Sequence, residues 1–138
     1  MPNTESPASD SSRTAKRRIL VVDDNRDSAL SLAMLLKITG NDTQTAYDGV
    51  EAVEAAAKYN PDVILLDIGL PKLNGYEAAR QIREQAGGDR IVLVALTGWS
   101  QDEDRQKSTD AGFNAHLVKP VDHAALTKLL ATLLPAVV

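Results

Sequence analysis

The chain has 138 residues and no cysteine, 43% of its residues are hydrophobic, and its formal net charge is −4. This length suits one domain with a real core, and the lack of cysteine excludes disulfides and thiolate chemistry. No apolar run approaches the roughly 20 residues of a membrane span, and no signal-peptide pattern opens the chain, so we expect a cytoplasmic protein without a membrane partner. After residue 18 the chain has 11 basic and 17 acidic groups, a balance that argues against nucleic-acid binding.

Residues 1–16 are expected to form a disordered tail or linker. The first fifteen, MPNTESPASDSSRTA, are mainly Ser, Pro, Thr and Asp and contain no hydrophobic anchor. Such a segment cannot bury enough apolar surface to offset the entropy lost on ordering. The folded domain is therefore predicted over residues 17–136.

Five short runs of the sequence have strand character. Four of them are rich in Val, Ile and Leu, and the run IVLVAL is apolar throughout, as expected for a strand buried on both faces. The run TQTA is weaker and is expected at an edge of the sheet. The strands are predicted over residues 18–22, 43–46, 62–66, 91–96 and 116–118.

A helix is predicted after each strand, because apolar residues recur at helical spacing and Gly or Pro ends the segments. In the first helix this spacing is shown by Leu32, Leu35, Leu36 and Ile38, and Gly40 ends it. Strict alternation of strand and helix implies a parallel sheet with helices on both faces, a doubly wound α/β fold. The helices are predicted over residues 27–39, 49–59, 76–85, 100–110 and 122–134.

Ligands of such sheets bind beyond the carboxyl ends of the strands, where this chain places acidic, hydroxylic and cationic residues. The first strand ends in Asp23-Asp24 and the third in Asp67, so neighbouring strands would bring three carboxylates into one crevice. Their charges repel unless a cation sits among them, and oxygen ligands select a hard cation such as Mg²⁺, which usually binds alongside a phosphate. Thr97 and Lys119, at the ends of the fourth and fifth strands, add a hydroxyl donor and a positive charge. Together these groups indicate a site for a phosphoryl group on Asp67.

Taken singly, each of these residues has a simpler interpretation. Asp24 or Asn25 can cap the first helix, Thr97-Gly98 can form a turn, and Lys119 can lie at the surface. Their joint position at four strand ends of one sheet is what favours a functional site.

Four sequence blocks, ILVVDDN, LLDIGLPKLNGYE, VALTGW and HLVKPVD, occur in this order and resemble the signature blocks of the two-component receiver domain, the chemotaxis response regulator type. The resemblance spans about residues 17–134 and implies a flavodoxin-like (βα)5 sheet with strand order 2-1-3-4-5. It also implies that Asp67 is the phosphoacceptor and that Asp23 and Asp24 hold Mg²⁺. Gly69 stands where the family uses a backbone carbonyl as a further metal ligand.

The resemblance also assigns roles at the ends of the last two strands. Thr97 matches the switch hydroxyl and Lys119 matches the lysine that pairs with the phosphoryl group, and the Lys119–Pro120 bond is cis in that family. His116 stands where many relatives carry an aromatic switch residue, so it is expected to couple to Thr97 less firmly or differently. Trp99 borders the path of hydrolytic water, where it either excludes that water or is a bystander.

The leading interpretation is a phosphorylation-controlled switch in a two-component phosphorelay. It would accept a phosphoryl group from a histidine kinase or a histidine phosphotransfer protein and catalyse only its own phosphorylation and dephosphorylation. By resemblance, it would signal to a downstream protein through the fourth helix, fifth strand and fifth helix. The sequence leaves open whether it is a single-domain regulator or a receiver excised from a hybrid kinase.

Other classes fit the sequence less well. A haloacid-dehalogenase-type phosphatase would also use Asp67 as nucleophile, but it needs an acid two residues later, where this chain has Gly69. A flavodoxin-like electron carrier needs a Ser/Thr/Gly-rich phosphate loop after the first strand, and this chain has none there. A degenerate receiver that binds without being phosphorylated is disfavoured, because all five chemical positions are present.

Overall fold

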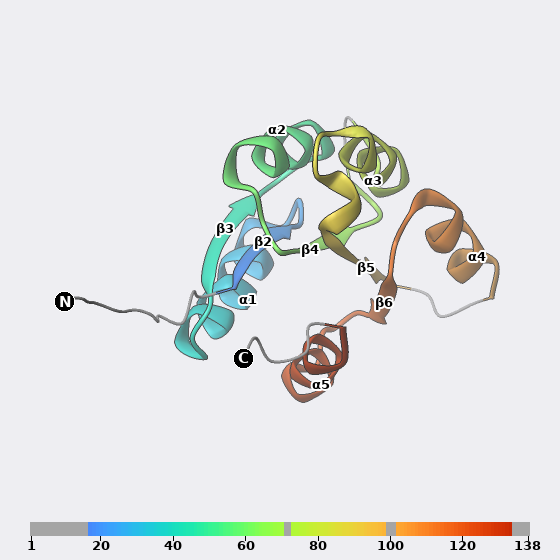
Figure 1. Ribbon diagram of the computed structural model, residues 1–138. Helices are drawn as coiled ribbons and strands as arrows, with labels where there is room; N and C mark the ends of the chain where they lie inside the picture. The colour runs from blue at the N-terminus through green and yellow to red at the C-terminus, as the bar shows by residue number, and fades with distance from the viewer. Residues whose placement is uncertain (1–16, 71–72, 99–101, 134–138) are drawn as a thin grey trace.

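A five-stranded parallel sheet forms the centre of the computed structural model, with the strands in the order β3-β2-β4-β5-β6 (Figure 1). In chain order this is 2-1-3-4-5, which confirms the predicted doubly wound, flavodoxin-like fold. The weakly apolar β3 lies at an edge, as expected. The strands are β2 (Arg18–Val22), β3 (Asp42–Ala46), β4 (Val63–Asp67), β5 (Val92–Thr97) and β6 (Ala115–Val118).

Helices cover both faces of the sheet (Figure 1). The side chains of α1 and α5 pack on one face, and those of α2, α3 and the end of α4 pack on the other. A short 3-10 helix, η1, follows α3. The bounds are α1 (Arg26–Ile38), α2 (Gly49–Tyr59), α3 (Gly75–Glu84), η1 (Gly88–Arg90), α4 (Asp102–Ala111) and α5 (His123–Leu133).

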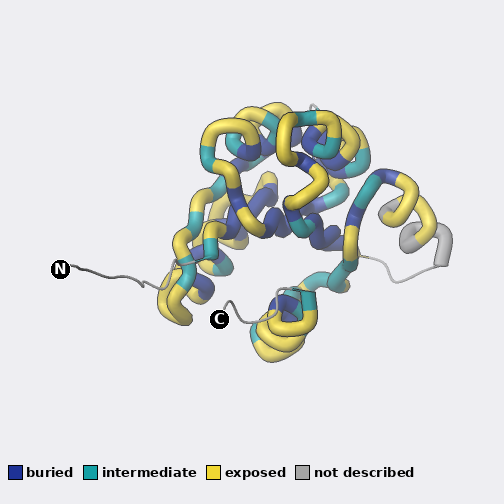
Figure 2. Tube along the Cα trace, viewed as in Figure 1, coloured by how far each residue is buried: buried dark blue, intermediate teal, exposed yellow. Residues whose placement is uncertain are grey.

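The core is divided by the sheet, because successive strand residues point to opposite faces. In β2, Leu20 packs among the side chains of α2 and α3, whereas Val21 packs among those of α1 and α5. All five residues of β4 are buried, and Figure 2 shows the buried strands as the dark centre of the molecule. Such double burial fixes the carboxyl ends of the central strands, where the predicted site residues lie.

Three of the helices begin at a polar side chain that satisfies a free backbone N–H group. Asn25, Asp48 and Asn74 each accept a hydrogen bond from the backbone nitrogen three residues on, at the starts of α1, α2 and α3. Of the two residues considered for the cap of α1, Asn25 is therefore the one that serves. These caps fix where the chain leaves β2, β3 and β4, at the edge of the sheet that carries the site.

The structure describes residues 17–70, 73–98 and 102–133, and in α4 it describes the side chains of residues 106, 107 and 109–111. The predicted tail, residues 1–16, lies outside these ranges, as does Trp99. Within the described ranges, no helix has the length and apolar character needed to cross a membrane.

Candidate functional site

Three carboxylates meet where β2 and β4 end. Asp23 follows β2 directly and Asp67 is the last residue of β4, and these strands are parallel neighbours. One carboxylate oxygen from each of Asp23, Asp24 and Asp67 lies within 4.8 Å of the other two. Asp23 and Asp67 are only 4% and 7% exposed, whereas Asp24 is open to solvent. The structure therefore brings together the three acids that the sequence placed in one crevice.

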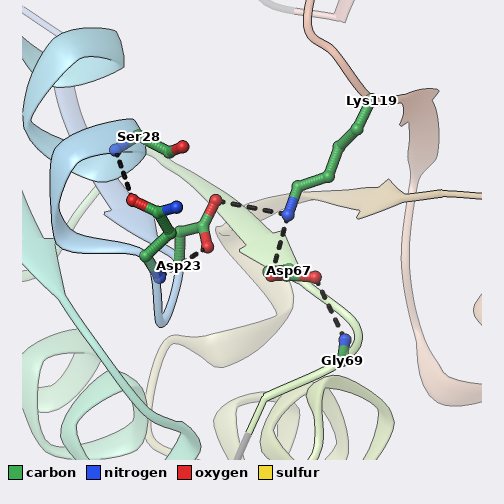
Figure 3. Close-up of polar contacts among 6 residues, drawn as sticks. Asp23, Ser28, Asp67, Gly69 and Lys119 are labelled. Atoms are coloured by element: carbon green, nitrogen blue, oxygen red, sulfur yellow. Dashed lines mark hydrogen bonds and ion pairs between the residues drawn. The ribbon is translucent and has the colours of Figure 1, made fainter.

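Lys119 supplies the positive charge of this crevice (Figure 3). Its Nζ lies 2.9 Å from Asp67 Oδ2 and 3.3 Å from Asp23 Oδ2. Burial lowers the pKa of Lys119, but the hydrogen bond and charge of Asp67, together with those of Asp23, outweigh it and raise the pKa above its ordinary value. Lys119 thus stays charged, and it joins two carboxylates that would otherwise repel each other.

The second oxygen of each buried acid is held by the backbone. Asp67 Oδ1 accepts a hydrogen bond of 3.0 Å from the Gly69 backbone nitrogen, and Asp23 Oδ1 accepts one of 3.0 Å from that of Asn25. The Asn25 side chain in turn accepts from the backbone nitrogen of Ser28 at the start of α1 (Figure 3). These contacts orient both carboxylates before any ligand arrives, a feature that the sequence did not predict.

The carboxyl ends of β5 and β6 lie side by side. The Lys119 backbone nitrogen donates to the Thr97 carbonyl oxygen at 2.7 Å, and the Lys119–Pro120 peptide bond is cis. Thr97 itself is buried as the last residue of β5. His116 lies in β6 opposite Ala95 and is partly buried. The predicted coupling of His116 to Thr97 stays a prediction.

Two cavities open beside Lys119. A hollow of about 380 Å³ is lined by Asp67, Thr97 and Lys119, and also by Tyr76 of α3 and Lys107 of α4, neither of which the sequence indicated. A groove of about 520 Å³ is also lined by Lys119. It runs along α1 to the connection between β6 and α5, and its walls are Asp23, Ser28, Ser31, Leu32, Leu35, Leu96, Lys119, Pro120 and Val121.

The donor set of the crevice fits a hard divalent cation. All three side chains offer carboxylate oxygens, and these are close enough together to bind one ion. Mg²⁺ prefers such ligands and keeps several waters, which the exposed position of Asp24 allows. Because Lys119 compensates only part of the negative charge, a cation here would relieve the remaining repulsion.

Residues 19–131 match the response regulator receiver domain. The chain belongs to this family. The match decides against the dehalogenase-type phosphatase and the flavodoxin-like electron carrier. It covers the described strands apart from Arg18, the first residue of β2, and the described helices apart from the last two residues of α5.

A curated relative of the receiver is the response regulator MprA of Mycobacterium ulcerans. It is 41% identical over 114 residues, which are 83% of this chain and 47% of MprA. The chain thus spans about half the length of this relative, so the relative's activity as a whole protein does not carry over directly.

Solved receivers have the same fold. The receiver domain of the sensor histidine kinase PA1611 from Pseudomonas aeruginosa PAO1 is 36% identical, with a TM-score of 0.78 over 86% of this chain and 97% of that one, and a magnesium ion is coordinated in its active-site cleft. A second match has 32% identity and a TM-score of 0.77, over 84% of this chain and 87% of that one. It comes from the Saccharomyces cerevisiae complex of the histidine phosphotransfer protein Ypd1 with the receiver domain of its downstream response regulator Ssk1.

Proposed function

We propose that this receiver is a phosphorylation-controlled switch of a two-component phosphorelay, with Asp67 as phosphoacceptor. The observation that carries the proposal is the geometry around Asp67. One of its oxygens bonds to the Lys119 ammonium and the other to the Gly69 backbone nitrogen, and the carboxylates of Asp23 and Asp24 lie within metal-sharing distance. A carboxylate this well held, beside a site for a hard cation, suits attack on a phosphorus atom.

The proposed reaction moves one phosphoryl group. An Asp67 carboxylate oxygen attacks the phosphorus of a phosphohistidine, the P–N bond breaks, and its electron pair leaves with the imidazole, which takes up a proton. Bound Mg²⁺ supplies positive charge that allows the anionic donor to approach the acids. Asp23, Asp24, Asp67 and the Gly69 carbonyl would hold this ion, while Lys119 and the Thr97 hydroxyl bind the phosphoryl oxygens. Hydrolysis of the acyl phosphate resets the switch, so the chain acts as a catalyst only on itself.

The phosphodonor is proposed to dock on α1. This helix exposes four large apolar side chains, those of Leu30, Met34, Leu35 and Ile38, which are 44–74% accessible. Leu35 also lines the groove of about 520 Å³ that reaches Asp23 and Lys119. A protein that brings a phosphohistidine to Asp67 can therefore cover the apolar face and reach the crevice at once. A histidine kinase or a phosphotransfer protein has this chemistry, and the similarity to a receiver solved with Ypd1 supports it.

The output is proposed to pass through α4, β6 and α5 to a downstream protein. β6 ends next to the hollow that contains Asp67, because Lys119, which lines the hollow, directly follows this strand. The last residue of β6, Val118, is 41% exposed and apolar. Whether the receiver acts alone or as part of a hybrid kinase stays open. The domain limits, the cytoplasmic location and the absence of nucleic-acid binding stay predictions.

The proposal is tested by labelling with acetyl phosphate. We expect the full chain to take up one acid-stable, base-labile phosphoryl group in the presence of Mg²⁺ and none in EDTA, because the three carboxylates repel an anionic donor without the cation. Asp67→Asn should abolish uptake. Asp27→Asn, which removes an exposed acid from the first turn of α1, should keep it. Uptake that persists in EDTA or in Asp67→Asn would refute the assignment.

A further inference from the structure

A second lysine lines the hollow that holds the phosphoacceptor. Nine of the described residues line it, and the cations among these nine are Lys119 and Lys107. Lys107 comes from α4 and is exposed. Its neighbour three residues on, Asp110, accepts a hydrogen bond from Gln106 instead, and within the described part of the chain Lys107 has no ion pair. Its ammonium is thus available to a ligand of this hollow.

Phosphorylation of Asp67 would leave uncompensated negative charge in the hollow, which a second cation could neutralise. An acyl phosphate on Asp67 carries about two negative charges at neutral pH and offers three acceptor oxygens, and Asp23 and Asp24 add one negative charge each. One divalent cation and Lys119 together fall short of this total by about one positive charge. Before phosphorylation Lys119 already serves two carboxylates. One more cation would neutralise the remaining negative charge in the hollow.

We infer that Lys107 is a second cationic ligand of the phosphoryl group, and that its recruitment couples α4 to the phosphorylated state. The inference rests on the proposed phosphorylation of Asp67 and names a residue through which that event reaches the output surface. A lysine side chain is long and flexible, so its ammonium can reach an anion across the hollow.

The helix that carries Lys107 is suited to respond. Among the α4 side chains that the structure describes, only Ala111, in the last turn, is buried. An element with few buried apolar contacts opens and shifts at low cost in free energy. A new ion pair near the middle of α4 therefore biases the position of this helix more than it would bias α3, where Ala78, Ala79 and Ile82 are buried.

The test uses beryllofluoride as the phosphoryl probe, with the full chain in saturating Mg²⁺. Titration calorimetry is to compare the parent with Lys107→Gln, Lys107→Arg and Lys58→Gln. Lys58 is a matched control because it is an exposed lysine near the end of α2 and lines a different trough with Arg18 and Asp42. Since an ion pair with an exposed lysine is screened by solvent, we expect Lys107→Gln to weaken beryllofluoride binding about two- to five-fold. Lys107→Arg should recover most of the affinity and Lys58→Gln should match the parent.

Two further readouts separate a ligand from a structural residue. Affinity for Mg²⁺ alone should not fall in Lys107→Gln, and the defect should shrink in high salt, which screens the ion pair. Amide hydrogen exchange over residues 102–111 should slow on addition of beryllofluoride in the parent, and this response should be lost in Lys107→Gln.

The possible results distinguish a failure of the proposed phosphorylation of Asp67 from a failure of the proposed role of Lys107. A parent that binds no beryllofluoride in Mg²⁺ would overturn the proposed function itself. A parent that binds it, with Lys107→Gln equal to Lys58→Gln in affinity and in exchange over α4, would overturn only the role of Lys107. Failure of Lys107→Arg to recover affinity would also overturn that role, because a charge-based contact tolerates either cation.

Discussion

Lys119 compensates the charges of the crevice in the metal-free protein, so its removal should have a definite sign and size. Lys119→Met keeps most of the apolar stem and removes the ammonium. Ion pairs of 2.9 Å to Asp67 and 3.3 Å to Asp23 are lost, and two buried carboxylates are left facing each other. We therefore expect the variant to unfold more easily than the parent in EDTA.

The size of the effect follows from the exposure of the pair. Removing one partner of a fully buried ion pair costs about 3–5 kcal/mol, whereas an exposed pair contributes about 0.2–1 kcal/mol. The side chain of Lys119 is 33% exposed, so solvent screens both contacts and the upper range does not apply. We expect a loss of about 1–2 kcal/mol, which is a factor of about 5–30 in the ratio of folded to unfolded protein.

Magnesium provides the decisive comparison. Mg²⁺ and the Lys119 ammonium compensate the same carboxylates, so each should weaken the effect of the other. By linkage, the stability lost in Lys119→Met should be smaller in saturating Mg²⁺ than in EDTA, and Mg²⁺ should bind the variant more tightly by the same free energy. Urea unfolding at several Mg²⁺ concentrations measures both quantities, with Lys128→Met on an exposed part of α5 as control. A variant as stable as the parent in EDTA, or a loss independent of Mg²⁺, would refute this reasoning.

The same contacts give a dependence on pH. Burial lowers the pKa of Lys119, but its contacts with Asp67 and Asp23 leave the net pKa above the ordinary value of 10.5. A cation with a raised pKa in the folded state stabilises the fold fully below its unfolded pKa, and this contribution is lost as the pH rises through the folded-state pKa. The stability difference between parent and Lys119→Met should therefore stay constant from neutral pH to about pH 9 and shrink above about pH 10.5. A difference that shrinks near pH 7 would show that another group controls it.

Two further predictions concern packing near the site and away from it. A Cβ on Gly75 would stand 2.6 Å from both the Asp67 carbonyl oxygen and the Ile68 Cα, so Gly75→Ala should cost about 1–3 kcal/mol in urea unfolding and slow phosphorylation by acetyl phosphate. Gly98→Ala, whose Cβ would meet no atom of the described residues within 4 Å apart from its chain neighbours, should keep the parent's midpoint. Equal midpoints for the two variants would contradict the close packing. Arg83 donates five hydrogen bonds to the connections after α3 and α4, so Arg83→Met should cost about 2 kcal/mol or more. Arg83→Lys should recover little of this in the same assay, because an ammonium lacks the planar fork of donors.

Most of the fold could be predicted because local and long-range signals agree. Four apolar runs and the weaker run TQTA predicted the bounds of the five strands to within one residue. Strict alternation with helices left few topologies to consider. The 3-10 helix η1 was missed, since the sequence showed only a break at Gly87-Gly88. At this turn Gly87 adopts a left-handed conformation, and the chain folds back so closely that a Cβ on Gly88 would overlap the Ile82 carbonyl oxygen. A pattern read along the chain cannot reveal such a contact.

The acids of the site could be predicted for a different reason than the contacts around them. Asp67 was visible because a charge at the end of an apolar strand is costly unless it is compensated, and the strand order then placed it beside Asp23. Lys107 and Arg83 gave no such signal, because a lysine or arginine on a helix surface is ordinary. The hydrogen-bond partners of Arg83 lie in η1, directly after it and in the connection after α4, whereas Lys107 shares the lining of a hollow with Asp67. Only the packing of the helices creates these neighbourhoods.

The strand that leads to Asp23 is packed more firmly than the strand that leads to Lys119. This difference predicts which helices should move when a ligand binds. On the acidic side, the Asp23 backbone nitrogen bonds to the Ala46 carbonyl oxygen of β3, and β2 is buried along most of its length. On the cationic side, the Lys119 backbone bonds to Thr97, but β6 is an edge strand whose residues are all partly or fully exposed. A ligand that pulls on Lys119 therefore works against fewer contacts than one that pulls on Asp23. Because α4 and α5 adjoin β6 in the chain, we expect displacement to spread toward them and not toward α1 and α2.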